Sequence, residues 1–224
     1  MNNSHTHPID AILLLGPTGV GKSPLGDTIA QYGLFGRRCY HLDFGSELRG
    51  AATDDERSRI YTVVELNTIH GVLERGLLLE NEHFPLARKI ISLFLLRVGF
   101  SKYDVLVLNG IPRHEEQARE IATIARIHCL VILDCSSEDV YCRIRENVGG
   151  DRTERVDDHH EMIRKKLVIF YERTTPLIKY YEKLGIKLYR INVQSMMTPA
   201  NAYINLSLLA AADPPVALVA EPPH

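Results

Sequence analysis

An octapeptide near the N-terminus constrains the fold of this chain more than any other feature. Residues 16–23 read GPTGVGKS and fit the pattern G-x-x-x-x-G-K-[ST], whose glycines let backbone N–H groups curve around a phosphate. The apolar run IDAILLL at 9–15 precedes it and is typical of a strand buried on both faces; a helix is expected to follow, up to about residue 32. This order predicts the nucleotide-binding unit of a P-loop protein.

The rest of the chain alternates between short apolar runs and amphipathic segments. Strands are predicted at 38–43, 104–109, 129–135 and 187–193, and helices at 45–76, 81–97, 114–126, 136–147 and 157–175, with one short helix after Pro199 and a loose tail at 212–224. Alternation of this kind favours a parallel sheet covered by helices on both faces. We therefore expect one α/β domain with the three-layer P-loop NTPase fold and a five-stranded parallel sheet.

Composition argues against several other classes of protein. The 224 residues include 26 basic and 28 acidic ones, a formal net charge of -2, so a general affinity for nucleic acid or anionic membranes is not expected. The four cysteines form no CxxC pair, and the longest apolar window, 90–100, contains Arg97 and is too short to span a bilayer. The first eight residues lack the apolar stretch of a signal peptide. We expect a cytoplasmic monomer with free thiols.

The P-loop motif assigns a chemical role to several residues. Lys22 would reach the β- and γ-phosphates of ATP, and the Ser23 hydroxyl would ligate Mg²⁺. The nucleotide would also contact the loop residues Gly16, Thr18, Gly19 and Gly21. Pro24 lacks the N–H that would help to hold the α-phosphate, so nucleotide binding is expected to be weaker or altered, and not abolished.

Beyond the loop, five segments in order resemble motifs of the adenylate kinase family. They are 43–49 (DFGSELR, similar to S-T-G-D-x-L-R), 76–81 (GLLLEN, similar to G-x-L-V-P-D), 109–118 (NGIPRHEEQA, similar to D-G-F-P-R-x-x-x-Q-A), Arg143-Ile144, and 155–158 (RVDD, similar to R-x-D-D). The resemblance extends over residues 9–193. It implies a nucleoside-monophosphate kinase with a core of 9–43, 77–146 and 156–211, a small helical acceptor-binding insertion at 44–76 and a short lid at 147–155.

The resemblance also implies how two substrates are held while ATP and AMP are converted to two ADP. Arg49 and Arg113 would grip the acceptor phosphate, since a guanidinium fork matches phosphate oxygens. The Gln117 amide both donates and accepts, which suits the adenine edge. Further acceptor contacts fall on Gly45, Leu79, Gly110 and Arg155; the catalytic cations are Lys22, Arg113, Arg143, Arg155 and Lys166; Arg143 also contacts ATP, and Asn109 joins Ser23 at the metal.

Several residues depart from the family pattern. The replacements are Asn109 for an aspartate at the metal, Phe44 for a threonine near the acceptor base, Ser46 for an aspartate, His114 for a threonine, Lys166 for an arginine, and Asn147 at the spacing of a second lid arginine, which Arg145 or Arg152 would have to replace. They leave two alternatives open. One is a kinase for UMP, CMP or a small metabolite, and the other is a nucleotide-binding regulatory protein with weak or no turnover.

Overall fold

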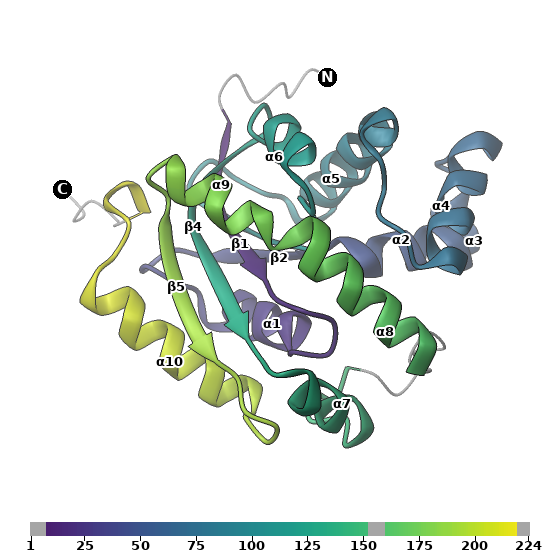
Figure 1. Ribbon diagram of the computed structural model, residues 1–224. Helices are drawn as coiled ribbons and strands as arrows, with labels where there is room; N and C mark the ends of the chain where they lie inside the picture. The colour runs from purple at the N-terminus through teal and green to yellow at the C-terminus, as the bar shows by residue number, and fades with distance from the viewer. Residues whose placement is uncertain (1–7, 152–159, 219–224) are drawn as a thin grey trace.

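A parallel β-sheet forms the centre of the computed structural model, which describes residues 8–151 and 160–218 (Figure 1). Its strands are β1 (Ile9–Leu15), β2 (Cys39–Asp43), β3 (Val105–Asn109), β4 (Ala125–Asp134) and β5 (Lys187–Asn192). The order across the sheet is β2-β3-β1-β4-β5, and every neighbouring pair is parallel. The predicted five-stranded parallel sheet is confirmed, and it has the α/β architecture expected from the sequence.

Helices and helical turns make up most of the remaining described chain. They are α1 (Lys22–Tyr32), α2 (Phe44–Thr53), α3 (Asp55–Ser58), α4 (Val63–Arg75), η1 (Asn81–His83), α5 (Phe84–Val98), α6 (Glu115–Ile121), α7 (Ser137–Arg145), α8 (His160–Ile169), the π-turn η2 (Phe170–Thr174), α9 (Pro176–Lys183), α10 (Pro199–Ala212) and η3 (Val216–Leu218). No helix within the described ranges is both long and apolar enough to cross a membrane.

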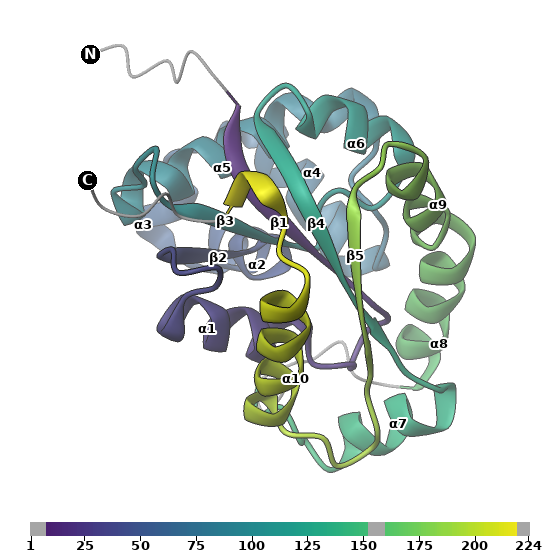
Figure 2. The same cartoon turned by 90° about the vertical axis from the view of Figure 1, so that its left-hand side faces the viewer.

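Alternation along the strands divides the core into two layers. In β1, Leu13 and Leu15 pack with α5, α6 and α9 on one face, whereas Ile12 and Leu14 pack with α1 and α10 on the other. Figure 2 shows α1 and α10 together on one face of the sheet. Because the crossovers place helices on both faces, the inner strands β1 and β3 are almost entirely apolar, and the carboxyl ends of the parallel strands meet at one edge.

The segment at 45–76 is not the continuous helix that the sequence predicted. The Asp54 carboxylate accepts hydrogen bonds from the N–H groups of Glu56 and Arg57 and so begins the short α3. Thr62 and Glu65 then form a reciprocal capping box that begins α4. These two N-terminal caps break the segment into α2, α3 and α4, and α3 and α4 lie to the right of the sheet in Figure 1.

Two predicted helix boundaries were also wrong. The helix expected at 114–126 ends at Ile121, because the chain enters β4 at Ala125. The helix expected at 157–175 is α8 followed by the π-turn η2, and Pro176 then starts α9 at a position where its missing N–H costs no helical hydrogen bond. Residues 157–159 lie outside the described part of the chain.

The C-terminal region is more ordered than expected. The helix after Pro199 is the 14-residue α10 rather than a short one. The expected loose tail packs onto the sheet as far as it is described: Leu218 is fully buried, and the Tyr189 hydroxyl donates to the Asp213 carbonyl at 2.6 Å. Leu218 accounts for this packing together with Pro215, which is also buried, whereas Val216 is exposed; residues 219–224 lie outside the described ranges.

Candidate active site

A pocket at the carboxyl edge of the sheet gathers most of the predicted site residues. It is bounded by the 16–23 loop, the ends of β2 and β3, α2, the connection after α4, and α8 with η2. The predicted site residues that line it are Gly16, Thr18, Gly19, Gly21, Lys22, Ser23, Gly45, Arg49, Leu79, Asn109, Gly110, Arg113, Gln117 and Lys166. This is the edge at which α/β proteins bind their ligands.

The 16–23 loop has the geometry of a phosphate cradle. The Lys22 ammonium lies inside the loop and donates to the carbonyl oxygens of Gly16 and Pro17, each at 2.7 Å. Gly19 has a φ of +77°, and a Cβ there would come within 2.5 Å of the Ile144 side chain. Glycine is therefore required where the loop turns against α7, and the loop leads directly into the N-terminus of α1.

Pro24 is accommodated in the first turn of α1. It is buried there, and its carbonyl accepts a hydrogen bond from the Thr28 hydroxyl at 2.8 Å. The N–H that proline lacks has no partner inside a helix at this position, so the fold tolerates the residue.

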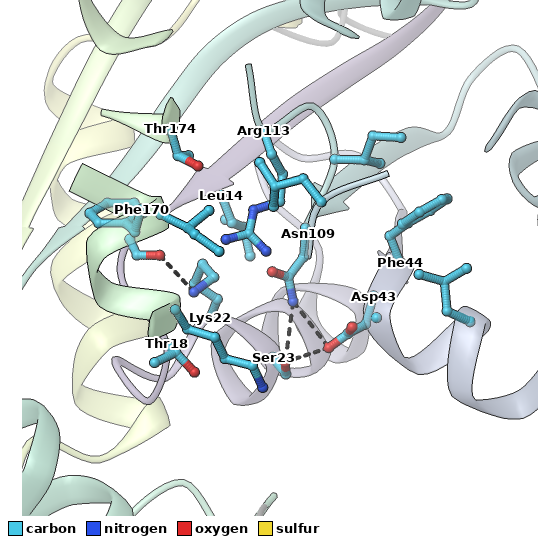
Figure 3. Close-up of a pocket in the computed structure, with 18 of the residues that line it drawn as sticks. Leu14, Thr18, Lys22, Ser23, Asp43, Phe44, Asn109, Arg113, Phe170 and Thr174 are labelled. Atoms are coloured by element: carbon cyan, nitrogen blue, oxygen red, sulfur yellow. Dashed lines mark hydrogen bonds between the residues drawn. The ribbon is translucent and has the colours of Figure 1, made fainter. Parts of the chain in front are cut away.

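Three side chains from three elements meet beside the loop (Figure 3). Asp43, the last residue of β2, accepts hydrogen bonds from the Ser23 hydroxyl and, at 3.2 Å, from the Asn109 amide. The same amide nitrogen lies 3.2 Å from Ser23 Oγ. Burial alone raises the pKa of Asp43, but the hydrogen bonds from Ser23 and from the Ser46 N–H, with the nearby Arg49 cation, bring it below its usual value. Asp43 is thus an ionised carboxylate against the P-loop.

This group of oxygen-bearing side chains fits Mg²⁺. The hydroxyl of Ser23 and the carboxylate of Asp43 offer the oxygen ligands that Mg²⁺ prefers, and the Asn109 amide directs its NH₂ group at both of them. Mg²⁺ in nucleotide sites is held by one or two carboxylates, water and phosphates. The sequence analysis assigned Ser23 and Asn109 to the metal and gave Asp43 no role. An acidic residue at the carboxyl end of a predicted strand next to a P-loop was the signal available for it.

Arg113 provides a second cationic position in the pocket. Its guanidinium points into the cavity (Figure 3), and no described residue forms a hydrogen bond or an ion pair with it. Burial and the nearby Arg173 cation lower the pKa of Arg113 to about 10, so it stays charged at neutral pH. Arg49 lines the same pocket. A partly buried guanidinium that no described residue pairs with is favoured by an anion beside it, and a phosphate matches its fork.

Gln117 is held by backbone groups on both sides of its amide. Its Oε1 accepts from the Arg113 N–H at 2.8 Å, and its Nε2 donates to the Leu79 carbonyl. The side chain is only 2% exposed. The structure therefore shows Gln117 joining the 76–81 segment to Arg113. Its predicted contact with the acceptor base stays a prediction.

His114 begins α6 as its N-cap. Its Nδ1 accepts a long hydrogen bond, 3.5 Å, from the Gln117 N–H. Burial, followed by the nearby Arg173 cation, lowers the pKa of His114, so the neutral ring is favoured in the fold.

Arg143 lies beside the P-loop and is not among the residues that line the pocket, so its predicted contact with ATP stays a prediction. It is 4% exposed, and its Nη1 donates to the carbonyl oxygens of Gln194, Ser195 and Met197 at 2.8–3.2 Å. A Cβ on Gly21 would lie 3.0 Å from Arg143 Nη2. Arg143 therefore holds the connection between β5 and α10 next to the P-loop, because its guanidinium donates to three carbonyl oxygens of that connection.

The remaining predicted cations come from α7, α8 and the segment between them. Lys166, on α8, lines the pocket. Arg155, predicted for catalysis and acceptor binding, and Arg152, a substitute for the second lid arginine, lie outside the described residues. Arg145, the other substitute, is exposed and pairs with the adjacent Glu146 at 2.8 Å.

Comparison with known proteins gives relatives of two kinds. UMP-CMP kinase 1 of Oryza sativa subsp. japonica is 28% identical over 79% of this chain and 65% of its own length, just under two thirds. An adenylate kinase of Haloarcula marismortui is 28% identical over 76% of this chain and 83% of its own, and adenylate kinase isoenzyme 1 of Bos taurus is 29% identical over 78% and 82%. No protein-family model matches the chain.

Solved structures give a looser likeness. A gluconokinase from Sinorhizobium meliloti 1021 is 16% identical, with 92% of this chain and 96% of that chain covered and a TM-score of 0.49. A superposition this loose adds nothing to the sheet order and the P-loop already described.

The relatives are of one class, the kinases of nucleoside monophosphates. The chain is similar to adenylate kinases and UMP-CMP kinases at 28–29% identity, and its sheet and P-loop are those of an α/β P-loop protein.

Proposed function

We propose that the protein transfers the γ-phosphoryl group of ATP to a nucleoside monophosphate, AMP, in the presence of Mg²⁺. One observation carries the proposal: the same pocket contains the Lys22 ammonium in a phosphate-binding loop and the unpartnered Arg113 guanidinium. Two separate anion positions in one cavity fit a reaction that brings two phosphorylated substrates together.

In the proposed reaction the protein positions both nucleotides and balances the charge of the transferring group. The P-loop backbone and Lys22 hold the ATP phosphates, and Lys22 exchanges its carbonyl contacts for phosphate oxygens. Arg113 and Arg49 hold the acceptor phosphate at the other end of the pocket, and Lys166 adds positive charge from α8. Mg²⁺, when bound, neutralises charge on the ATP phosphates. The insertion at 44–76 and the lid at 147–155 would close over the substrates and exclude water.

The choice of acceptor base is the finer part of the proposal. Gln117 favours AMP, because an amide pairs with the donor and acceptor groups of adenine. UMP or CMP is the second candidate. Two observations support this second candidate. Backbone groups already engage both ends of the Gln117 amide that would read adenine, and the relatives include UMP-CMP kinases as well as adenylate kinases.

An assay with several nucleoside monophosphates distinguishes AMP from UMP or CMP as the acceptor. The purified protein is incubated with ATP, Mg²⁺ and each of AMP, GMP, UMP and CMP, and diphosphate formation is measured by chromatography. A Lys22→Ala protein, prepared identically, controls for contaminating kinases and should lose about 10²–10³-fold in rate. Transfer that is largest for AMP and falls by this factor in Lys22→Ala is the expected result.

Other outcomes redirect the proposal. Larger transfer to UMP or CMP would retain the kinase and replace AMP as its acceptor. No transfer to any of the four, with ATP still bound, would reject the nucleoside-monophosphate kinase. It would leave a kinase for a small metabolite or a nucleotide-binding regulatory protein.

A further inference from the structure

We infer that Asp43 supplies the carboxylate that holds the Mg²⁺ of the bound nucleotide, and that Asn109 is its positioning partner. The inference rests on the proposed function only in taking the P-loop to bind ATP with its metal. Asp43 ends β2 and Asn109 ends β3, and the two are direct partners in the register of these parallel strands. A carboxylate and an amide therefore lie side by side at the edge of the sheet next to the loop.

The two oxygens of Asp43 have different partners. Oδ1 accepts from the Ser46 N–H at 2.9 Å and caps α2, whereas Oδ2 accepts from the Ser23 hydroxyl and the Asn109 amide. A helix cap requires only one oxygen. The second oxygen is directed at the hydroxyl that a P-loop presents to Mg²⁺, and this is the position from which a carboxylate can hold the metal or its water.

Asn109 is suited to hold a neighbouring carboxylate in place. An aspartate at 109 would put two negative charges at adjacent strand ends, and one of them would then take up a proton. The amide instead donates to Asp43, and its nitrogen lies 3.3 Å from Nε2 of His41, whose Nδ1 is 2.8 Å from Asp27. Gly26 leaves room for the His41 ring, since a Cβ there would come within 2.4 Å of it.

The carboxylate is thus placed on β2 in this chain, whereas the family motif that the chain resembles has one at the position of Asn109 on β3. The negative charge of Asp43 lies next to Ser23, and the neutral amide of Asn109 holds the carboxylate in place by a hydrogen bond. The loss of an acid at 109 does not then remove metal binding.

The test measures metal-dependent nucleotide binding in the absence of any acceptor. ATP affinity is determined by calorimetry with Mg²⁺ and with EDTA for the wild type and for Asp43→Asn. Asparagine is as good an N-cap as aspartate, so α2 is retained while the charge is lost. The expected result is a fall of about 10–100-fold in the factor by which Mg²⁺ strengthens ATP binding. Metal-free ATP should bind Asp43→Asn at least as tightly as the wild type, since a like charge near the phosphates has gone.

Two further variants make the test specific. Asp54→Asn is the control, because Asp54 caps α3 and does not line the pocket. This variant should leave the Mg²⁺ effect on ATP affinity unchanged. The double variant Asp43→Asn with Asn109→Asp returns a carboxylate to the neighbouring strand and should recover part of the effect. Mn²⁺ can serve as a second probe, because its electron paramagnetic resonance signal reports binding to the protein–ATP complex directly.

An unchanged Mg²⁺ effect in Asp43→Asn would overturn the inference. If that variant also lost transfer, Asp43 would serve the acceptor instead of the metal. Failure of the proposed function is a separate result: the wild type would transfer to no nucleoside monophosphate, while the Mg²⁺ effect on ATP affinity and its dependence on Asp43 would persist.

Discussion

The two ends of the pocket differ in how closely they follow the motifs of the kinases that the chain resembles. At the ATP end, the loop from Gly16 to Ser23 fits its motif at every defined position and folds as the motif predicts. At the acceptor end the residues depart from the pattern: Phe44 and His114 are replacements, and Gln117 is held by backbone groups. The difference teaches that phosphate binding requires particular residues at particular positions of the loop. The residues that hold the metal and the base, in contrast, can be replaced when neighbouring residues take over their roles.

The largest effect expected at the acceptor end is that of Arg113→Lys. The variant keeps the charge but loses the guanidinium fork, so kcat/KM for the acceptor should fall by about 10–100-fold, while the KM for ATP changes little. Steady-state kinetics with each substrate varied in turn measures both. Arg119→Lys is the matched control, because Arg119 lies on α6, pairs with Glu115 and does not line the pocket. An equal loss on the ATP side would remove the distinction between the two ends.

Arg143→Ala tests the ATP end through stability. Loss of the guanidinium leaves three carbonyl oxygens without that donor, so the free energy of unfolding should fall by about 1–3 kcal/mol. Urea unfolding followed by circular dichroism gives this value. Unchanged stability with a hundredfold loss in kcat would instead make Arg143 a catalytic residue, as the sequence resemblance implied.

Gln117→Leu distinguishes positioning from base recognition. If Gln117 acts by joining Leu79 to Arg113, its loss should weaken all acceptors alike, by about 1–2 kcal/mol in binding free energy. Acceptor KM values for AMP, UMP and CMP are the readout. A loss confined to AMP would show that the side chain reads adenine after all.

The smallest effect concerns His114 and pH. Because folding lowers the pKa of His114, the unfolded chain binds more protons below its own histidine pKa of about 6.5, and stability should decrease as the pH falls through this region. His114→Asn keeps an N-cap and should flatten the dependence between pH 7.5 and 5.5 in urea unfolding. The same slope in both proteins would assign the effect to another group.

Local pattern was sufficient to predict the sheet and the P-loop, and most of the site residues that the motifs predicted line one pocket. Apolar runs located the strands within a few residues, and the loop motif located Lys22 and Ser23. The contact between Asp43 and Asn109 could not be predicted in this way, because it depends on the register of two strands 66 residues apart in sequence. Asp54 and Thr62 were likewise missed as helix starts within an amphipathic segment.

The central claim is that one pocket holds two nucleotides, with phosphates running from the P-loop to Arg113. Diadenosine pentaphosphate, which carries two adenosines on one phosphate chain, tests it most directly by competition calorimetry. The account predicts one molecule bound per chain, displaced by ATP and independently by AMP, and bound more weakly by Arg113→Lys. Displacement by ATP alone, with no change in Arg113→Lys, would contradict it.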